Sequence, residues 1–240
     1  MNKFYQISAN KRDNYIKSSG LDVKIEGKKG NQFFMNMCER YILKSEDILE
    51  IGTGTGVVPF WLGSLNKKMI CLDSSINMLK IAKKNCQNYP KINFLFGNLN
   101  KITFKSNSFD LVIKRLAPDN IKEMRRVLKN GGYFLNLTNG EEDAIELKNI
   151  FNLPKHESVQ DFNIKLEKNN LLLKKGREFK FFEIYKTYEQ LKKMLEIAPI
   201  VPVALLNKKK NIDQLKKIFY NSKEFILTRH KYVTGAIKTA

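Results

Sequence analysis

The stretch LEIGTGTG, at residues 49–56, constrains the fold of this chain more than any other feature. A short apolar run leads into three glycines at alternate positions, and the apolar segment VVPFWLGSL follows them. Glycines in a strand-to-helix loop let the backbone approach a nucleotide closely, because they carry no Cβ. The pattern therefore predicts the first strand, loop and helix of a nucleotide-binding α/β sheet.

Apolar runs and amphipathic segments alternate from about residue 47 onwards. The segments between the runs have the spacing of helices, and Ser74 or Ser75 can cap the second of them. Strands that alternate with helices predict a parallel sheet covered by helices on both faces. The five predicted strands are DILEIG, KMICLD, INFLFG, SFDLVIKR and YFLNLT.

The flanking segments are less regular. A length of 240 residues with 42% hydrophobic content fits a single domain over residues 1–240. Residues 1–45 are predicted to be a mostly helical N-terminal cap. Residues 186–225 are predicted to be a helical insertion, whose apolar stretch APIVPVALL forms a wall of the acceptor pocket, a dimer contact or core. Further along the chain we expect a helix over residues 158–175 and strands over residues 177–187 and 225–238.

The glycine spacing excludes two common phosphate-binding loops. Position 57 is valine, so the dinucleotide pattern G-x-G-x-x-G fails, and no Gly-Lys-Ser/Thr follows. Glu50 would repel a pyrophosphate, but it suits a cationic ligand such as S-adenosylmethionine, which carries a sulfonium and an ammonium. Asp73 can accept hydrogen bonds from both ribose hydroxyls, and Asn98 can bond the adenine edge. These residues end predicted strands, where open α/β sheets bind their ligands.

Four segments in the chain resemble, in the same order, the motifs of class I S-adenosylmethionine-dependent methyltransferases. They are most similar to the methyltransferase type 11 group. The resemblance implies an α/β fold with a Rossmann-like, doubly wound, seven-stranded sheet in the order 3-2-1-4-5-7-6, in which strand 7 is antiparallel. The tail, from FEIYKTYEQLKKMLEIAPIVP to ILTRHKYVTGAIK, resembles the C-terminal region of a bacterial and archaeal branch. The four segments are LEIGTGTG, CLDSSINML, FGNLNKITFKSNSFDLV and EMRRVLKNGGYFL.

The same resemblance implies S-adenosyl-L-methionine as cofactor and S-adenosyl-L-homocysteine as its product. The glycines would wrap the methionine moiety, Asp73 would hold the ribose, and Asn98 would meet the adenine where the family often has Asp. Met78 could instead be a core residue, and Asp73 could be only a helix N-cap. The full set implied for the cofactor is Glu50, Gly52, Thr53, Gly54, Gly56, Asp73, Ser74, Met78, Asn98, Leu99 and Arg115.

Methyl transfer requires an aligned nucleophile and the exclusion of water more than a dedicated triad. The acceptor is expected near the end of the fourth strand, in VIKRLAPDN, where Pro118 would begin the next helix. Arg115 would either form a cationic floor for an acidic acceptor or pair with Asp119 or Glu123. Candidates for a catalytic role are Arg115, His156, Glu141 with its neighbour Glu142, and the N-terminal Tyr5 and Tyr15, whereas His230 is expected to be structural.

The net charge of +19 raises RNA as a partner. However, 36 of the 43 basic residues are lysines, and they are scattered along the chain with one tight cluster at residues 208–210. Solvated lysines on helix faces therefore explain the charge better than an RNA-binding face does.

The sequence thus predicts a cytoplasmic enzyme that methylates an O, N or C nucleophile of a small molecule. The alternatives are an RNA base methyltransferase, favoured by the charge and the LAP element, and a catalytically silent, cofactor-binding interaction module. No apolar run approaches the roughly 20 residues that span a bilayer. The three cysteines form no CxxC pair, which favours a reducing compartment and predicts no metal site. A monomer or homodimer is expected.

Overall fold

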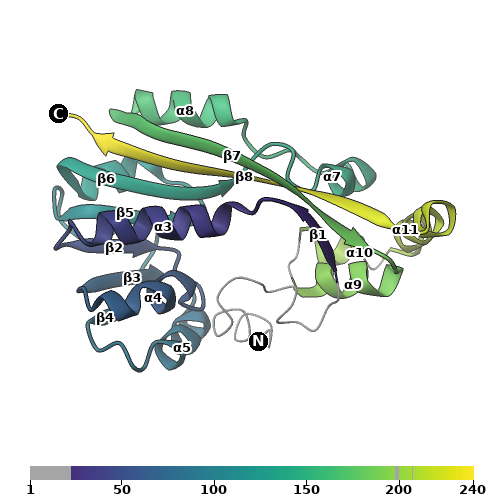
Figure 1. Ribbon diagram of the computed structural model, residues 1–240, viewed down its shortest axis with the longest axis horizontal. Coiled ribbons are helices and arrows are strands. Elements are labelled where there is room, and N and C mark those ends of the chain that lie inside the picture. The colour runs from purple at the N-terminus through teal and green to yellow at the C-terminus, as the bar shows by residue number, and fades with distance from the viewer. Residues whose placement is uncertain (1–22, 198–199, 207) are drawn as a thin grey trace.

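Eight strands form one mixed sheet with helices on both faces in the computed structural model, which describes residues 23–197, 200–206 and 208–240 (Figure 1). The strands are β1 (Lys24–Gly27), β2 (Ile48–Ile51), β3 (Met69–Asp73), β4 (Ile92–Phe96), β5 (Phe109–Arg115), β6 (Leu128–Asn139), β7 (Leu171–Tyr185) and β8 (Phe225–Lys238). The helices are α3 (Gly30–Ile42), α4 (Val57–Leu62), α5 (Ile76–Asn85), α6 (Ile121–Val127), α7 (Ile145–Phe151), α8 (Val159–Lys168), α9 (Tyr188–Ile197), α10 (Val203–Leu206) and α11 (Lys209–Ser222), and a 3-10 turn, η1 (Gly63–Leu65), follows α4.

The strand order is β1-β7-β8-β6-β5-β2-β3-β4. The predicted α/β class and helix-covered sheet are confirmed, but the seven-stranded sheet and its order were wrong. The added strand is β1, which comes from the segment predicted to be a helical cap and pairs antiparallel with the end of β7. Strands β2 to β6 are parallel, and β8 is antiparallel to both of its neighbours. The described part of the predicted cap, residues 23–45, thus holds one strand and one helix.

Apolar side chains alternate between the two faces of the parallel strands and build two cores. On one face, Ile113 and Leu135 belong to the core that packs against α3, α4 and α5. On the other face, Val112 and Phe134 belong to the core that packs against α6 and α8. Because β2, β3 and β5 are parallel, their carboxyl ends lie side by side, and the glycine loop begins there.

Strands β7 and β8 continue beyond the end of β6 (Figure 1). The last pair between β6 and β8 is Asn139 with Lys231, whereas pairing between β7 and β8 continues to Tyr185 with Phe225. The extension packs against α7 and α9 to α11 around a third core, and the predicted helical insertion at residues 186–225 corresponds to α9, α10 and α11. Its role on the acceptor side stays a prediction.

The helix predicted over residues 158–175 was wrong in its second half. Helix α8 ends at Lys168, and Asn170 has a left-handed backbone with φ 52°, which a helix interior does not tolerate. The apolar residues that follow begin β7 and pair with β8. Among the described residues, no helix has the length and apolar character to cross a bilayer.

Candidate active site

The glycine loop follows β2 and depends on its glycines for two different reasons. Gly52 has a φ of 71°, and a Cβ placed there would lie 2.3 Å from the Cβ of Ala117. Gly54 has a φ of 56°, but a Cβ there would meet no atom of the described residues within 4 Å. Gly52 therefore lets the loop after β5 pack closely, whereas Gly54 turns toward open space in which a ligand can approach the backbone.

Glu50, on β2 directly before this loop, is a buried carboxylate in need of a partner. It is 1% exposed, and its Oε2 atom has no hydrogen-bond partner among the described residues. Burial raises the pKa of Glu50 from its ordinary 4.5 to about 7, although the Thr53 hydroxyl, the Cys71 thiol and the charge of Arg115 act in the opposite direction. Such a carboxylate indicates a site completed by a ligand.

Asp73, at the end of β3, holds the loop and the next helix. Its Oδ2 accepts a hydrogen bond from the backbone N–H of Gly54 at 2.7 Å, and its Oδ1 accepts one from the N–H of Ser75 at 2.9 Å. A carboxylate can accept about four hydrogen bonds, so both oxygens keep capacity for the ribose hydroxyls expected there. Ser75, rather than Ser74, caps α5 by accepting from the N–H of Met78 at 3.3 Å.

The residues expected at the adenine lie around the ends of β3 and β4. Met78 and Leu99 are half-buried, and Ser74 is exposed. Asn98 is exposed, and its Oδ1 accepts a hydrogen bond from the N–H of Asn100 at 2.8 Å. The Asn98 side chain therefore stabilises its own turn, and its contact with adenine stays a prediction.

The two basic residues that end β5 point to opposite faces of the sheet. Lys114 is fully buried, and its ammonium donates to the Ala117 carbonyl at 2.8 Å and pairs with Asp119 at 2.6 Å. Arg115 lies on the α3 side, where its Nη2 donates to Asn31 at 3.4 Å. Of the two carboxylates expected as partners of Arg115, Asp119 pairs with Lys114, and Glu123 pairs with Arg126 at 2.7 Å.

The loop that Lys114 holds is the predicted acceptor loop. Leu116 has a left-handed backbone with φ 52°, which is uncommon for a residue with a bulky side chain, and it is 41% exposed. Asn120 caps α6, which begins at Ile121, so the prediction that Pro118 begins this helix was wrong. A strained, exposed loop against the glycine loop is a suitable place for an acceptor to meet the cofactor.

Removing the acid of the Lys114–Asp119 pair, in which only the lysine is fully buried, should destabilise the protein more than removing the base. Asp119→Asn leaves an uncompensated buried ammonium and should cost roughly 3 kcal/mol of unfolding free energy, whereas Lys114→Met should cost about 1 kcal/mol. Glu142→Gln is the control, because the Lys180–Glu142 pair is 45% and 44% exposed and should contribute less than about 1 kcal/mol. Urea unfolding measures all three, and equal costs for Asp119→Asn and Lys114→Met would contradict this account.

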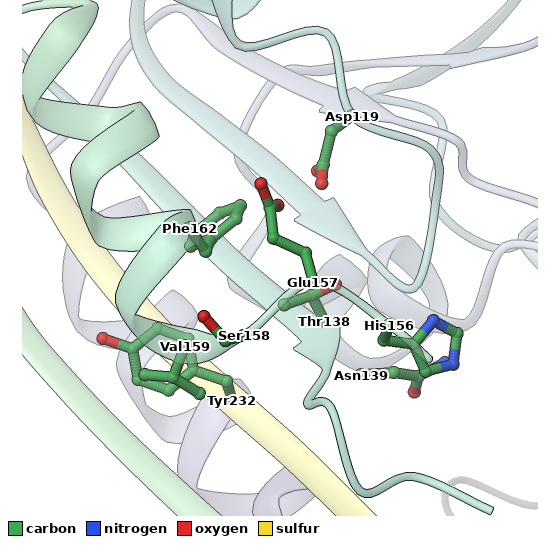
Figure 2. A pocket seen from close by; sticks show the side chains of 9 residues that line it. All are labelled: Asp119, Thr138, Asn139, His156, Glu157, Ser158, Val159, Phe162 and Tyr232. Atoms are coloured by element: carbon green, nitrogen blue, oxygen red, sulfur yellow. The ribbon is translucent and has the colours of Figure 1, made fainter. Parts of the chain in front are cut away.

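A pocket of about 90 Å³ lies on the α8 side of the same loop, between the end of β6 and the start of α8 (Figure 2). In Figure 2 the side chains of Asp119 and Glu157 extend toward one another across it, while His156 lies beside Asn139 on another wall. The His156 Nε2 atom is 3.3 Å from Asn139 Nδ2. His156 therefore reaches a polar pocket, but its catalytic role stays a prediction.

The remaining candidates are less central. Glu142 pairs with Lys180 at 2.6 Å, and Glu141 is half-buried beside it. His230 is fully buried, with its Nε2 atom 2.9 Å from Glu178 Oε2, in agreement with a structural role. Tyr5 and Tyr15 lie outside the described residues.

Sequence reasoning missed a buried charged group formed by Asp143, Lys148, Arg229 and Lys231, none of which is more than 7% exposed. Its signal was the run TRHK within an otherwise apolar final strand, because charged residues on a buried strand require partners. Among the described residues, no three His, Cys, Asp or Glu side chains are grouped to hold a metal ion.

The residues present fit S-adenosylmethionine at the glycine loop. The unpartnered Oε2 atom of Glu50 suits a cationic amino acid moiety, the open side of Gly54 gives room for it, and Asp73 offers acceptors to a ribose. A pyrophosphate would meet a buried acid at the same point.

Comparisons with known proteins find a match over the part of the chain that holds the glycine loop. Residues 48–132 match the family model described as a methyltransferase domain. The demethylmenaquinone methyltransferase of Lysinibacillus sphaericus (strain C3-41) is 36% identical over 87 residues, which cover 33% of this chain and 37% of that protein. The chain therefore spans only about a third of the length of this curated relative.

Solved structures show a similar fold over a longer part of the chain. A functionally unknown protein from Deinococcus radiodurans R1 has a TM-score of 0.64 at 14% identity, and the match covers 90% of each chain. A geranyl diphosphate methyltransferase, solved with geranyl diphosphate and sinefungin, has a TM-score of 0.53 at 10% identity and covers 85% of this chain and 77% of that one. Residues 48–132 therefore match a methyltransferase domain, and the solved structures share the fold over most of the chain.

Proposed function

We propose that this chain transfers the methyl group of S-adenosylmethionine to an O, N or C nucleophile of a small molecule. One observation carries the proposal most directly: the buried Glu50 carboxylate has an oxygen without a partner in the described structure, immediately below an open glycine loop. A positively charged ligand at this point would compensate the acid, whereas a nucleotide phosphate would oppose it.

Each residue of the site has a role in this proposal. Glu50 would neutralise the cationic amino acid moiety, Gly54 would admit the ligand to the backbone, and Asp73 would hold the ribose. The bound cofactor supplies an electrophilic methyl group. The acceptor loop held by Lys114 would then position the nucleophile and exclude water, which accounts for much of the rate in such transfers.

The acceptor class is supported by the names of relatives rather than by an identified acceptor. The first curated relatives are named demethylmenaquinone methyltransferases, which act on a small molecule. Their best matches cover only about a third of this chain, so the acceptor would be selected by the part that differs, including the extension of β7 and β8. We propose a cytoplasmic monomer or homodimer.

RNA is the second candidate acceptor. The chain carries a net charge of +19, and Lys175 and Arg177 on β7 lie 4.9 Å and 5.3 Å from the centre of the Phe33 ring. Aromatic rings beside cations also occur in proteins that bind single-stranded RNA. Mass spectrometry can separate these two acceptor classes. The protein is incubated with S-adenosylmethionine and either a metabolite panel or total RNA, and only one of the two should gain methyl groups.

Asp73→Ala should weaken S-adenosylhomocysteine binding roughly 10- to 100-fold, because hydrogen bonds to a carboxylate contribute about 1.5–3 kcal/mol. Isothermal titration measures the affinity directly. Asp213→Ala is the matched control, since Asp213 is an exposed acid on α11. Unchanged affinity in Asp73→Ala would refute the ribose role. If the wild-type protein does not bind S-adenosylhomocysteine, the enzyme proposal and the cofactor-binding module both fail.

A further inference from the structure

A network of buried charges lies beneath α7, beyond the end of β6 and away from the glycine loop. Asp143 is its centre. The Oδ1 atom of Asp143 accepts hydrogen bonds from Arg229 Nε at 3.1 Å, from Lys231 Nζ at 2.9 Å and from the backbone N–H of His230 at 3.0 Å. We refer to Asp143, Lys148, Arg229 and Lys231 as the α7 charge cluster.

The cluster has more positive than negative charge. Arg229 also donates to Glu183 at 3.4 Å, and the hydroxyl of Tyr185 donates to the same carboxylate oxygen at 2.8 Å. Three cations, Lys148, Arg229 and Lys231, thus face two carboxylates, Asp143 and Glu183. Coulomb repulsion among the cations is stronger here than at the surface, because the surroundings are of low polarity.

Lys148 is the cation left over. It is 5% exposed, and its Nζ atom makes no hydrogen bond to any described residue. Its pKa is lowered, chiefly by burial, although the charge of Asp143 acts in the opposite direction. An ammonium group that is buried without a partner costs several kcal/mol. Such a group is stabilised either by losing its proton or by an anion that binds beside it.

The cluster lies directly behind one wall of the pocket shown in Figure 2. Lys231 Nζ donates a second hydrogen bond to Asn139 Oδ1, and Asn139 lines the pocket together with His156. The Lys231–Asn139 hydrogen bond therefore connects the cluster to the pocket wall.

We propose that the α7 charge cluster binds the carboxylate or phosphate group of a small molecule, admitted at the pocket wall formed by Asn139 and His156. The anion would complete Lys148 and neutralise the surplus charge. If the methyltransferase function proposed above holds, this group belongs to the methyl acceptor. Strands β5 and β6 end side by side, so the acceptor loop after β5 and the cluster beyond β6 lie at the same edge of the sheet.

The test uses inorganic phosphate and acetate as probes of the two chemistries. The melting temperature of the wild-type protein should rise saturably with one or both salts, relative to sodium chloride at equal ionic strength. Lys148→Met should melt higher than the wild type without the anion, because it removes an uncompensated charge. It should also weaken the apparent affinity for the anion about tenfold or more. Lys155→Met is the matched control, because Lys155 is an exposed lysine in the adjacent loop, and it should respond as the wild type does.

Two results would overturn the proposal. One is a wild-type protein that shows no specific response to either anion, which needs no variant to observe. The other is a Lys148→Met protein with an unchanged anion response. S-adenosylhomocysteine binding is measured in the same preparations: if it is intact while the anion response is absent, only the anion site fails. If S-adenosylhomocysteine does not bind while the anion response depends on Lys148, the methyltransferase proposal fails and the anion-site proposal stands.

Discussion

Glu50→Gln is expected to stabilise the ligand-free protein at pH 8 and, at the same time, to weaken its binding of S-adenosylhomocysteine. The wild-type carboxyl has a pKa of about 7 in the folded protein against an ordinary 4.5. At pH 8 it is ionised in a buried position, which costs about 3 kcal/mol relative to the protonated form. The amide never ionises, so unfolding in urea at pH 8 should show a gain approaching that size.

The stabilising effect of Glu50→Gln should depend on pH. Because the folded-state pKa is raised, the contribution of Glu50 to stability is fully present below pH 4.5 and is lost as the pH rises to about 7. The advantage of Glu50→Gln should therefore shrink to about 1 kcal/mol or less at pH 5. Glu157→Gln, which changes a surface carboxylate, is the control and should show neither effect.

Ligand binding should move in the opposite direction. The ammonium of S-adenosylhomocysteine favours the ionised Glu50, so binding should release a proton and become tighter between pH 6 and pH 8. Glu50→Gln should lose this dependence and bind roughly 10- to 100-fold more weakly at pH 8. A variant that is less stable at pH 8 and binds normally would show that Glu50 only supports the loop.

Gly52→Ala and Gly54→Ala should separate the two uses of the glycine loop. A methyl at Gly52 would lie 2.3 Å from Ala117 with a positive φ, so Gly52→Ala should cost roughly 3 kcal/mol of unfolding free energy. A methyl at Gly54 meets no described atom within 4 Å, so Gly54→Ala should cost only about 1 kcal/mol of backbone strain.

Gly54→Ala, although it should be the more stable of the two variants, should bind S-adenosylhomocysteine more weakly than Gly52→Ala does. The methyl of Gly54→Ala would enter the space proposed for the ligand, and titration with S-adenosylhomocysteine should show a loss of at least about tenfold. Gly131→Ala is the control for strain alone, because Gly131 also has a positive φ, 77°, and open surroundings, and it lies near the start of β6, whereas the glycine loop follows the end of β2. If Gly54→Ala binds as Gly131→Ala does, the ligand does not approach the backbone there.

The sequence was most informative where short-range patterns decide the structure. The glycines, Glu50 and Asp73 all lie within one strand–loop–helix unit or at the end of the next strand. The candidate cofactor site could therefore be predicted from short-range sequence patterns. Which basic residue at the end of β5 would hold Asp119 could also have been decided in advance, because consecutive residues on a strand face opposite sides.

The C-terminal half was harder because its structure depends on distant partners. The segment from Leu171 to Lys175 has residues compatible with a helix, yet it becomes part of β7 because β8, more than 50 residues later, offers it a hydrogen-bonding edge. Strand β1 likewise exists only through its pairing with β7. The charges around Asp143 come from β8 and α7, and no spacing in the sequence reveals their convergence.

The position of β8 sets an order on folding. This strand is inserted between β6 and β7, and those two strands meet in the sheet only through it. A nascent chain that has emerged as far as α11 therefore still has an incomplete sheet, with an open edge on β6 and another on β7. Such edges pair readily with other chains. The protein would be most vulnerable to aggregation in the interval before residues 225–238 leave the ribosome. Until β8 has formed, the exposed edges of β6 and β7 have no strand to pair with.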